Sequence, residues 1–322
     1  MKFRVVFFFL LAATFFGCKE VHLKDAPTIG FMDAFEDATM QKAKQGFYDA
    51  MEKNGFSEKD TTINIIYKNA QGNIPTLVQI VQYFKEQRVK AIVACPSIAT
   101  IAAMQNTVDV PVFMMVSPEP EILHLELEPY RKLDFLHGVG ESLDYIDTSF
   151  LMIKKLVTPK SGKLKVGMIF NQAEPQSVNA LKKIESIALA GNIEVIALPV
   201  NNSSELQMVT KSLTEKNIDA FFANPDNTVF AGFEVILNSC NTKNIPVFTS
   251  EAGLVDRGAV AAYGADLYQW GYQCGELVSR YLKGETDNSK LYEKVAKRVK
   301  VYNAEACKRM NITVDSSFQL IK

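Results

Sequence analysis

Two polar residues with possible binding chemistry follow short apolar runs in stretches that read almost alike, AIVACPSIAT and AFFANPDNTV. In the first stretch, the hydroxyl of Ser97 and the backbone N–H groups of a helix that begins there, including that of Ala99, could bind an anionic group. In the second stretch, Asp226 could pair with an ammonium group, and Asn227 follows it. Helix capping is the alternative role for Ser97 and Asp226. The sequence predicts that Asp226→Ala abolishes binding and leaves the fold intact.

Six further polar residues stand where expected strands end or expected helices begin. For Glu174, Ser177 and Asp266 there is also an ordinary structural explanation, as a first-turn acid, a helix cap or a hinge residue. These weaker binding candidates are Ser117, Glu174, Ser177, Ser250, Glu251 and Asp266.

Aromatic residues bear on the apolar part of a bound molecule. Phe31 and Phe35 lie near the end of the first expected strand, where a ring could stack on an aromatic or apolar group. Core packing is the alternative for each. A sugar site would be expected to use a flat tryptophan platform, but Trp270, the single tryptophan, falls inside a helical pattern. A sugar is therefore a less favoured ligand than an amino acid.

Several classes of function find no support in the residues. The cysteines after Cys18 are far apart, without CxxC pairs or nearby histidines, so we expect no metal site, redox motif or disulfide. Neither a GxxxxGK[ST] loop nor an early GxGxxG fingerprint occurs. Lys and Arg number 35 against 36 Asp and Glu, so no basic surplus indicates nucleic acid. We expect no cofactor and no enzymatic activity.

Strand and helix patterns alternate from residue 28 onward and fall into two consecutive sets. The first set runs from PTIGFM to PVFMMV, and the second runs from LDYIDTSFLMIKKLV to IPVFTS. Strands separated by helices predict right-handed crossovers and parallel sheets. In such sheets, ligands bind beyond the carboxyl ends of the strands. The two similar stretches then occupy matching edges of two lobes that face each other across a cleft.

The N-terminal segment MKFRVVFFFLLAATFFGC has a basic start and an apolar run too short to be a typical membrane span. Its Gly-Cys ending resembles a bacterial lipoprotein signal, which implies a signal peptide over residues 1–17, lipidation of Cys18 and a tether over residues 18–27. An ordinary export signal with a coincidental cysteine is the alternative. Either interpretation predicts an exported protein, and the first anchors it to the membrane.

From Thr28 to about Ile312 the chain resembles ABC-transporter substrate-binding lipoproteins of the tryptophan/tyrosine-binding type. The resemblance rests on IIYKNAQGN, ACPSIAT, FNQAEPQSV, ANPDNTV, SEAGLVDRGAVAAYG and DLYQWGYQCG. Glu251 matches an acidic residue of that family, whereas Ala252 replaces a second acid. Ser117 and Pro118 stand where the family tends to have Thr-Asp.

This resemblance implies the type I periplasmic binding protein fold, an α/β fold of two doubly wound lobes joined by three crossovers. We expect an N-terminal lobe of residues 28–136 and 262–290, and a C-terminal lobe of residues 137–261 and 291–322. The implied function is capture of a small zwitterionic solute, foremost an aromatic or apolar amino acid, by a monomer that serves an ABC permease and its ATPase. A receptor domain for a signalling partner and a sugar- or nucleoside-binding protein remain alternatives.

Overall fold

The computed structural model describes residues 26–35, 38–125, 135–285 and 292–321. The predicted signal peptide, the lipidation site Cys18 and most of the tether lie outside these residues. Within them, no helix has both the length and the apolar character needed to cross a bilayer.

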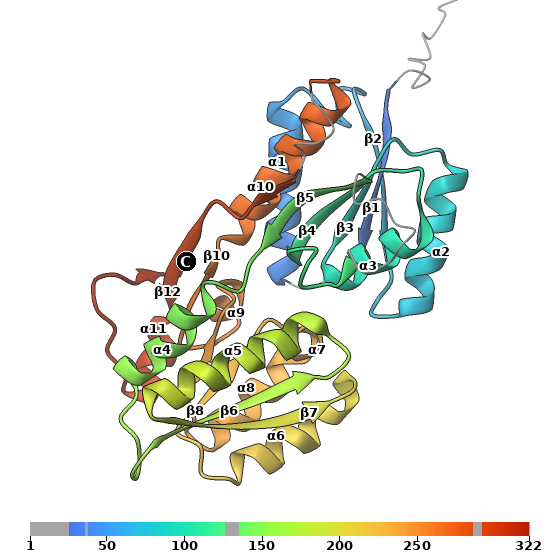
Figure 1. Ribbon diagram of the computed structural model, residues 1–322. Helices are drawn as coiled ribbons and strands as arrows, with labels where there is room; N and C mark the ends of the chain where they lie inside the picture. The colour runs from blue at the N-terminus through green and yellow to red at the C-terminus, as the bar shows by residue number, and fades with distance from the viewer. Residues whose placement is uncertain (1–25, 36–37, 126–134, 286–291, 322) are drawn as a thin grey trace, which may run out of the picture.

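Two β-sheets form the centres of two lobes (Figure 1). The first sheet has the order β11-β5-β4-β3-β1-β2, and the second has the order β13-β12-β10-β9-β8-β6-β7. All described pairings are parallel except that of β10 with β12. The strands are β1 (Thr28–Asp33), β2 (Asn64–Asn69), β3 (Ile92–Cys95), β4 (Val112–Pro118), β5 (Leu136–Glu141), β6 (Leu164–Asn171), β7 (Ile193–Val200), β8 (Ala220–Ala223), β9 (Val247–Thr249), β10 (Ala261–Ala265), β11 (Tyr292–Lys294), β12 (Arg298–Tyr302) and β13 (Gln319–Leu320).

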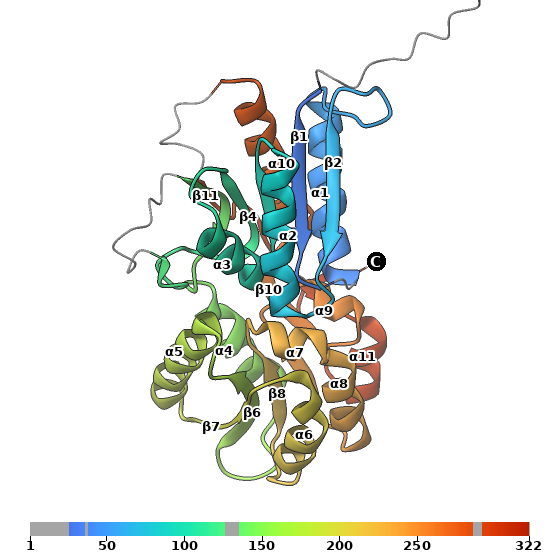
Figure 2. The ribbon, with the colours of Figure 1, turned by 90° about the vertical axis from the view of Figure 1, so that its right-hand side faces the viewer.

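Helices cover both faces of each sheet, as the alternating pattern predicts (Figure 2). In the first lobe, α1 and α10 pack on one face and α2 and α3 on the other. In the second lobe, α6, α7, α8 and α9 cover one face, and α4, α5 and α11 cover the other. The helices are α1 (Ala38–Lys53), α2 (Ile74–Glu86), α3 (Ser97–Asn106), α4 (Ile146–Leu156), α5 (Pro175–Gly191), α6 (Leu206–Thr214), α7 (Asn227–Ala231), α8 (Phe233–Thr242), α9 (Gly253–Asp256), α10 (Leu267–Leu282) and α11 (Ala304–Met310).

The chain passes between the lobes three times, after β5, after β10 and after β11. These passages confirm the predicted type of hinge, but sheet pairing places them a few residues later than the sequence pattern did. β5 and β11 pair within the first sheet, and β10 pairs within the second. The chain completes a strand before it crosses, because a buried backbone group left without a hydrogen bond is unfavourable.

Close packing of α1 against α10 holds the start of α10 near the hinge. A Cβ atom at Gly271 would lie 1.7 Å from the carbonyl oxygen of Ala43, and one at Gly46 would lie 2.0 Å from that of Tyr268. Only glycine allows the two backbones to approach this closely. The contact brings the first turn of α10, which carries Trp270, to the space between the lobes.

Candidate functional site

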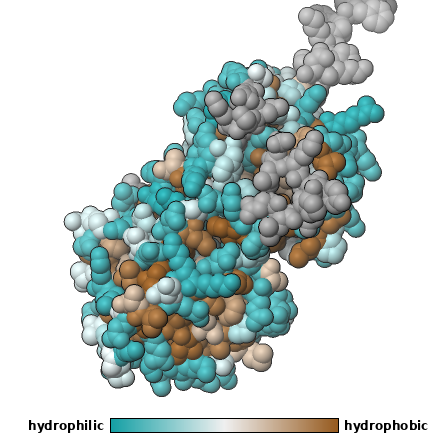
Figure 3. Space-filling model, in the orientation of Figure 1, coloured by the Kyte–Doolittle hydropathy of each residue, from teal (hydrophilic) through white to brown (hydrophobic). Residues whose placement is uncertain are grey.

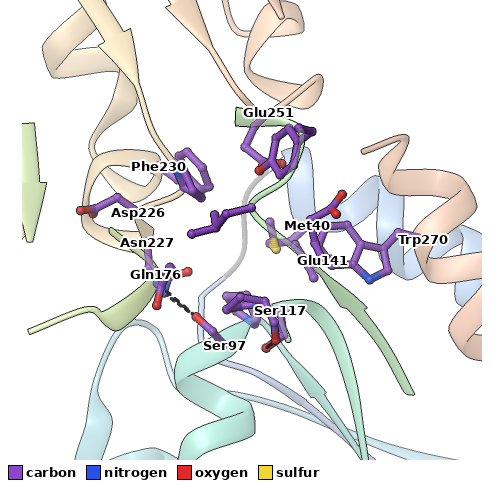
Figure 4. A pocket seen from close by; sticks show the side chains of 16 residues that line it. Met40, Ser97, Ser117, Glu141, Gln176, Asp226, Asn227, Phe230, Glu251 and Trp270 are labelled. Carbon is purple, nitrogen blue, oxygen red and sulfur yellow. Dashed lines mark hydrogen bonds between the residues drawn. The ribbon is translucent and has the colours of Figure 1, made fainter. Parts of the chain in front are cut away.

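A pocket lies between the two lobes at the carboxyl ends of their strands (Figure 4). In the space-filling view, hydrophobic surface is visible where the lobes meet (Figure 3). The pocket is lined by Met40, Pro96, Ser97, Val116, Ser117, Pro118, Glu141, Leu143, Tyr145, Gln176, Pro225, Asp226, Asn227, Phe230, Glu251 and Trp270.

Five of the residues singled out from the sequence line this pocket, and seven do not. Those in the lining are Ser97, Ser117, Asp226, Asn227 and Glu251. Those outside it are Phe31, Phe35, Ala99, Glu174, Ser177, Ser250 and Asp266.

Each of the seven has another place in the fold. Phe31 is fully buried against Phe47 and Tyr48 in the core between the first sheet and α1, and Phe35 packs against the same core. Ala99 is buried within α3. Asp266 accepts the backbone N–H of Gln269 and caps α10. Ser250 is fully buried directly before Glu251, and Ser177 and Glu174 bond within the second lobe.

The carboxylate of Asp226 is turned into the second lobe, away from the middle of the pocket (Figure 4). It accepts the backbone N–H of Val229 at 2.9 Å, that of Asn171 at 2.6 Å and the hydroxyl of Ser177 at 2.6 Å. Burial raises the pKa of Asp226, and these three hydrogen bonds oppose the rise. The geometry therefore matches the capping alternative rather than an ammonium partner.

These contacts change the expected effect of Asp226→Ala. Because the side chain is 1% exposed, its removal leaves three donors buried without acceptors. We expect the free energy of unfolding to fall by about 3 kcal/mol, measured by urea denaturation. Asp266→Ala, which removes a more exposed cap, is the matched control and should have a smaller effect. If Asp226→Ala instead leaves stability unchanged and abolishes binding, the carboxylate of Asp226 contacts the solute and is not mainly a helix cap.

The two helix N-termini at the pocket differ in their electrostatics. In α7, the first three backbone N–H groups all donate to carboxylates of the same lobe, those of Asn227 and Thr228 to Glu174 and that of Val229 to Asp226. In α3, which begins at Ser97, no side chain caps the N-terminus. The N–H of Ala99 donates to the carbonyl of Pro96 at 3.0 Å, so the backbone N–H groups of Ser97 and Ile98 are the ones that let α3 bind an anion, whereas the first three of α7 are already bonded.

Glu251 provides a buried carboxylate on the second lobe's side of the pocket. The hydroxyl of Tyr145 lies 3.5 Å from its Oε1 atom, and among the described residues it forms no ion pair with Lys or Arg. Burial raises the pKa of Glu251 to about 8, and the negative charge of Glu141 adds to the rise. A buried carboxylate in this position favours a cation.

Glu141, at the end of β5, already has a cationic partner. The guanidinium of Arg298, at the start of β12, donates to both of its carboxylate oxygens. Arg298 also lies over the ring of Tyr145, at 5.6 Å from the centroid. The pair of Glu141 and Arg298 thus joins the end of β5 in the first lobe to the start of β12 in the second. Glu251 faces the pocket without a cationic partner of this kind among the described residues.

Part of the apolar wall of the pocket comes from the first turns of helices that follow strands. Met40 lies in the first turn of α1, Phe230 in α7 and Trp270 in the first turn of α10. The indole N–H of Trp270 donates to the carbonyl of Val139 at 2.9 Å. The sequence did not predict these residues as part of the site, because their helical periodicity resembles that of core positions. Their place directly after a cleft-facing strand end is the signal that could have found them.

A β-bulge shapes the first lobe's side of the pocket. The pairing of β4 with β5 shifts register between Met114 and Ser117, and Val116 has a φ of 51°. This left-handed conformation is rare for a β-branched residue. Bulges commonly redirect side chains at functional sites, and here Val116 and Ser117 both line the pocket.

The pocket encloses about 40 Å³. A cavity that holds one benzene molecule measures roughly 150 Å³. An aromatic amino acid therefore fits only if the lobes part slightly or side chains of the wall move. Within the described residues, no group of His, Cys, Asp and Glu has the arrangement of a metal site.

Known proteins match the chain over nearly the whole described length. The family model for ABC transporter substrate binding proteins matches residues 28–320. The chain is 31% identical over 271 residues to a tyrosine-binding protein of Clostridioides difficile, covering 83% of this chain and 76% of that protein.

Solved structures share the fold. A domain from Streptococcus pneumonia in complex with L-Trp has a TM-score of 0.81 and 19% identity, and the match covers 91% of this chain and 97% of that chain. A ligand-free, open substrate binding protein with adhesive properties from Clostridium difficile has a TM-score of 0.66, with 23% identity, 92% of this chain and 99% of that chain covered. The family match and the 31% identity to the tyrosine-binding protein show that the chain belongs to the ABC transporter substrate-binding proteins.

Proposed function

We propose that this protein is the extracytoplasmic solute-binding component of an ABC importer and that it captures an α-amino acid with an aromatic or apolar side chain. One observation carries the proposal: the interlobe pocket has a buried carboxylate, Glu251, on one lobe and the uncapped N-terminus of α3 on the other. An amino acid carries one group for each, an ammonium and a carboxylate.

The charges of the pocket support this orientation of the solute. Its lining contains Glu141, Asp226 and Glu251 but no Lys, Arg or His. The charged side chains that a purely anionic solute would meet are all negative, whereas an ammonium group would compensate Glu251. The carbonyl oxygen of Gln176, buried without a hydrogen-bond partner among the described residues, offers a further acceptor for the ammonium.

The solute carboxylate would bind at the start of α3. Ser97 is the first residue of that helix, and its Oγ atom accepts hydrogen bonds from the opposite lobe, so its hydroxyl hydrogen can still be donated. The dipole of α3 favours a negative charge at the same end. Met40, Phe230 and Trp270 then provide the apolar surroundings of the solute side chain.

Transport requires partners beyond this chain. The family description supports an ABC permease and its ATPase as the recipients of the solute. The N-terminal segment supports export and anchoring through a lipid on Cys18. Lobes that close around a solute would present a joint surface to the permease, since a ligand that contacts both lobes shifts the population toward the closed form.

Matched ligands test the proposal. L-tyrosine, L-tryptophan or L-phenylalanine at about 100 times its dissociation constant should stabilise the protein by roughly 2.7 kcal/mol, read as a thermal shift. Tyramine, which lacks the carboxylate, and 3-(4-hydroxyphenyl)propionate, which lacks the ammonium, should each bind at least tenfold more weakly than L-tyrosine in calorimetry, because each leaves one pocket group unpaired.

Two results would overturn this assignment. Tight binding of a sugar or nucleoside, without binding of any amino acid, would replace the ligand class. Equal affinity for tyramine and L-tyrosine would remove the role of the α3 N-terminus.

A further inference from the structure

Glu174 lies outside the pocket lining, yet it bonds to two residues that line it. Its Oε2 atom accepts the backbone N–H of Asn227 at 2.8 Å, the side-chain amide of Asn227 at 2.9 Å and the side-chain amide of Gln176 at 2.6 Å. Its Oε1 atom accepts the N–H and the hydroxyl of Thr228 at 3.1 and 2.9 Å. Burial, with the charge of Asp226, raises the pKa of Glu174 to about 7.

The same two amides reach the opposite lobe. Ser97 Oγ accepts a hydrogen bond from Asn227 Nδ2 at 2.9 Å and one from Gln176 Nε2 at 3.4 Å. Dashes mark hydrogen bonding to Ser97 in Figure 4. All three side chains are less than 10% exposed. These bonds join the lobes directly, between residues far apart in the sequence, and they need no solute.

The carboxylate determines which way the amides face. An ionised carboxylate only accepts hydrogen bonds, so the nitrogen of each amide must be turned toward Glu174. Each nitrogen carries two hydrogens, and the second of these is directed to Ser97. For Gln176, the same orientation leaves the carbonyl oxygen as the atom without a protein partner.

We propose that Glu174 is a positioning residue for a latch, formed by Ser97, Asn227 and Gln176, that stabilises the closed arrangement of the lobes before any solute binds. The latch raises the fraction of empty molecules that are already closed. Since the apparent dissociation constant equals the intrinsic one divided by that competent fraction, a larger closed fraction lowers it, and Glu174 strengthens solute binding without contacting the solute.

A purely structural role for Glu174, as a second cap for α7, makes a different prediction. Replacing Glu174 would then weaken the second lobe to the same degree whether or not Ser97 is present. A latch couples the two positions, because each substitution removes the same interlobe bonds and the second has little left to remove.

The test measures the closed fraction of ligand-free protein by small-angle X-ray scattering for the wild type, Ser97→Ala, Glu174→Gln and the double variant. We expect each single substitution to lower the closed-to-open ratio about fivefold or more, and the double variant to match the single ones. Glu205→Gln is the matched control, because Glu205 accepts comparable bonds from Asn201 on an exposed turn of the same lobe. It should leave the ratio unchanged.

Additive effects of the two substitutions, an unchanged ratio in Ser97→Ala, or a wild type that is wholly open without ligand would each overturn the latch. If Glu174→Gln does not fold, Asn227→Ala takes its place in the double-variant comparison with Ser97→Ala. Asn227→Ala keeps the hydrogen bond from the backbone N–H of residue 227 to Glu174. No solute is present in these measurements. A negative result for the latch therefore does not contradict the proposed function, and a different solute would not contradict the latch.

Discussion

Glu251→Gln is expected to weaken amino-acid binding about 100-fold at pH 7.5, the largest effect of any single substitution in the pocket. Removing one member of a buried charge pair costs about 2 to 5 kcal/mol, and 1.4 kcal/mol corresponds to a factor of ten. The ammonium group of the solute would be enclosed against a neutral amide, with Glu141 already paired to Arg298. Isothermal titration calorimetry with L-tyrosine measures the change.

The ligand itself supplies the control for this prediction. An analogue without the ammonium group should bind the wild type and Glu251→Gln with similar affinity, because neither complex contains the charge pair. Retained affinity for L-tyrosine in the variant would show that Glu251 is not the ammonium partner.

The ligand-free closing equilibrium is expected to depend steeply on pH. In the closed form, burial and the charge of Glu141 raise the pKa of Glu251 from its ordinary value of 4.5 to about 8. In an open form this carboxylate faces water and regains its ordinary pKa. The closed form therefore binds the proton more tightly, so acid favours closing.

Proton linkage gives the direction and the size of the change in the closed-to-open ratio with pH. Between about pH 5 and 8, each unit of decrease in pH should raise the closed-to-open ratio of the empty protein by up to tenfold. The groups around Glu251 that share this field are Glu141, Tyr145 and, through Glu141, Arg298. Trp270, the single tryptophan of the chain, lines the pocket, so its fluorescence reports closing.

Glu251→Gln is again the decisive comparison. The variant has no carboxylate to titrate at this position, and its fluorescence should be much less dependent on pH over the same range. Equal pH dependence in the wild type and the variant would assign the transition to another group, with Glu174 the next buried carboxylate to replace.

The sequence predicts where a residue lies relative to a strand, but not the direction of its side chain. The sequence placed Ser97 and Asp226 at matching edges of two lobes, and both line the pocket. It could not show that the carboxylate of Asp226 turns inward to Asn171 and Ser177. A pattern of strands locates the Cα atom, whereas hydrogen-bond partners from distant segments orient the side chain.

Some elements also differ from the predicted pattern. The stretch NTVFAGFEVILNSCN reads as one helix but forms α7 and α8, which meet at Gly232. A Cβ atom there would lie 2.2 Å from a methyl carbon of Leu206, so a larger residue where the helix breaks would require the Leu206 side chain to move. The short strand β11 was missed because its pairing with β5 joins segments far apart in the sequence.

The sequence alone determined the alternation of strands and helices, the two-lobed fold and the edges at which a ligand could bind, because local periodicity and chain order carry that information. Only the tertiary structure decided which polar groups remain available to a ligand. The carboxylates of Glu174 and Asp226 accept the first N–H groups of α7, and the guanidinium of Arg298 pairs with Glu141. Glu251 and the start of α3 remain available to a ligand in the pocket. The bonds of Glu174 to α7 join segments of one lobe that are far apart in the sequence, and the pairing of Glu141 with Arg298 joins strands that the crossings between the lobes separate, so no local pattern records either.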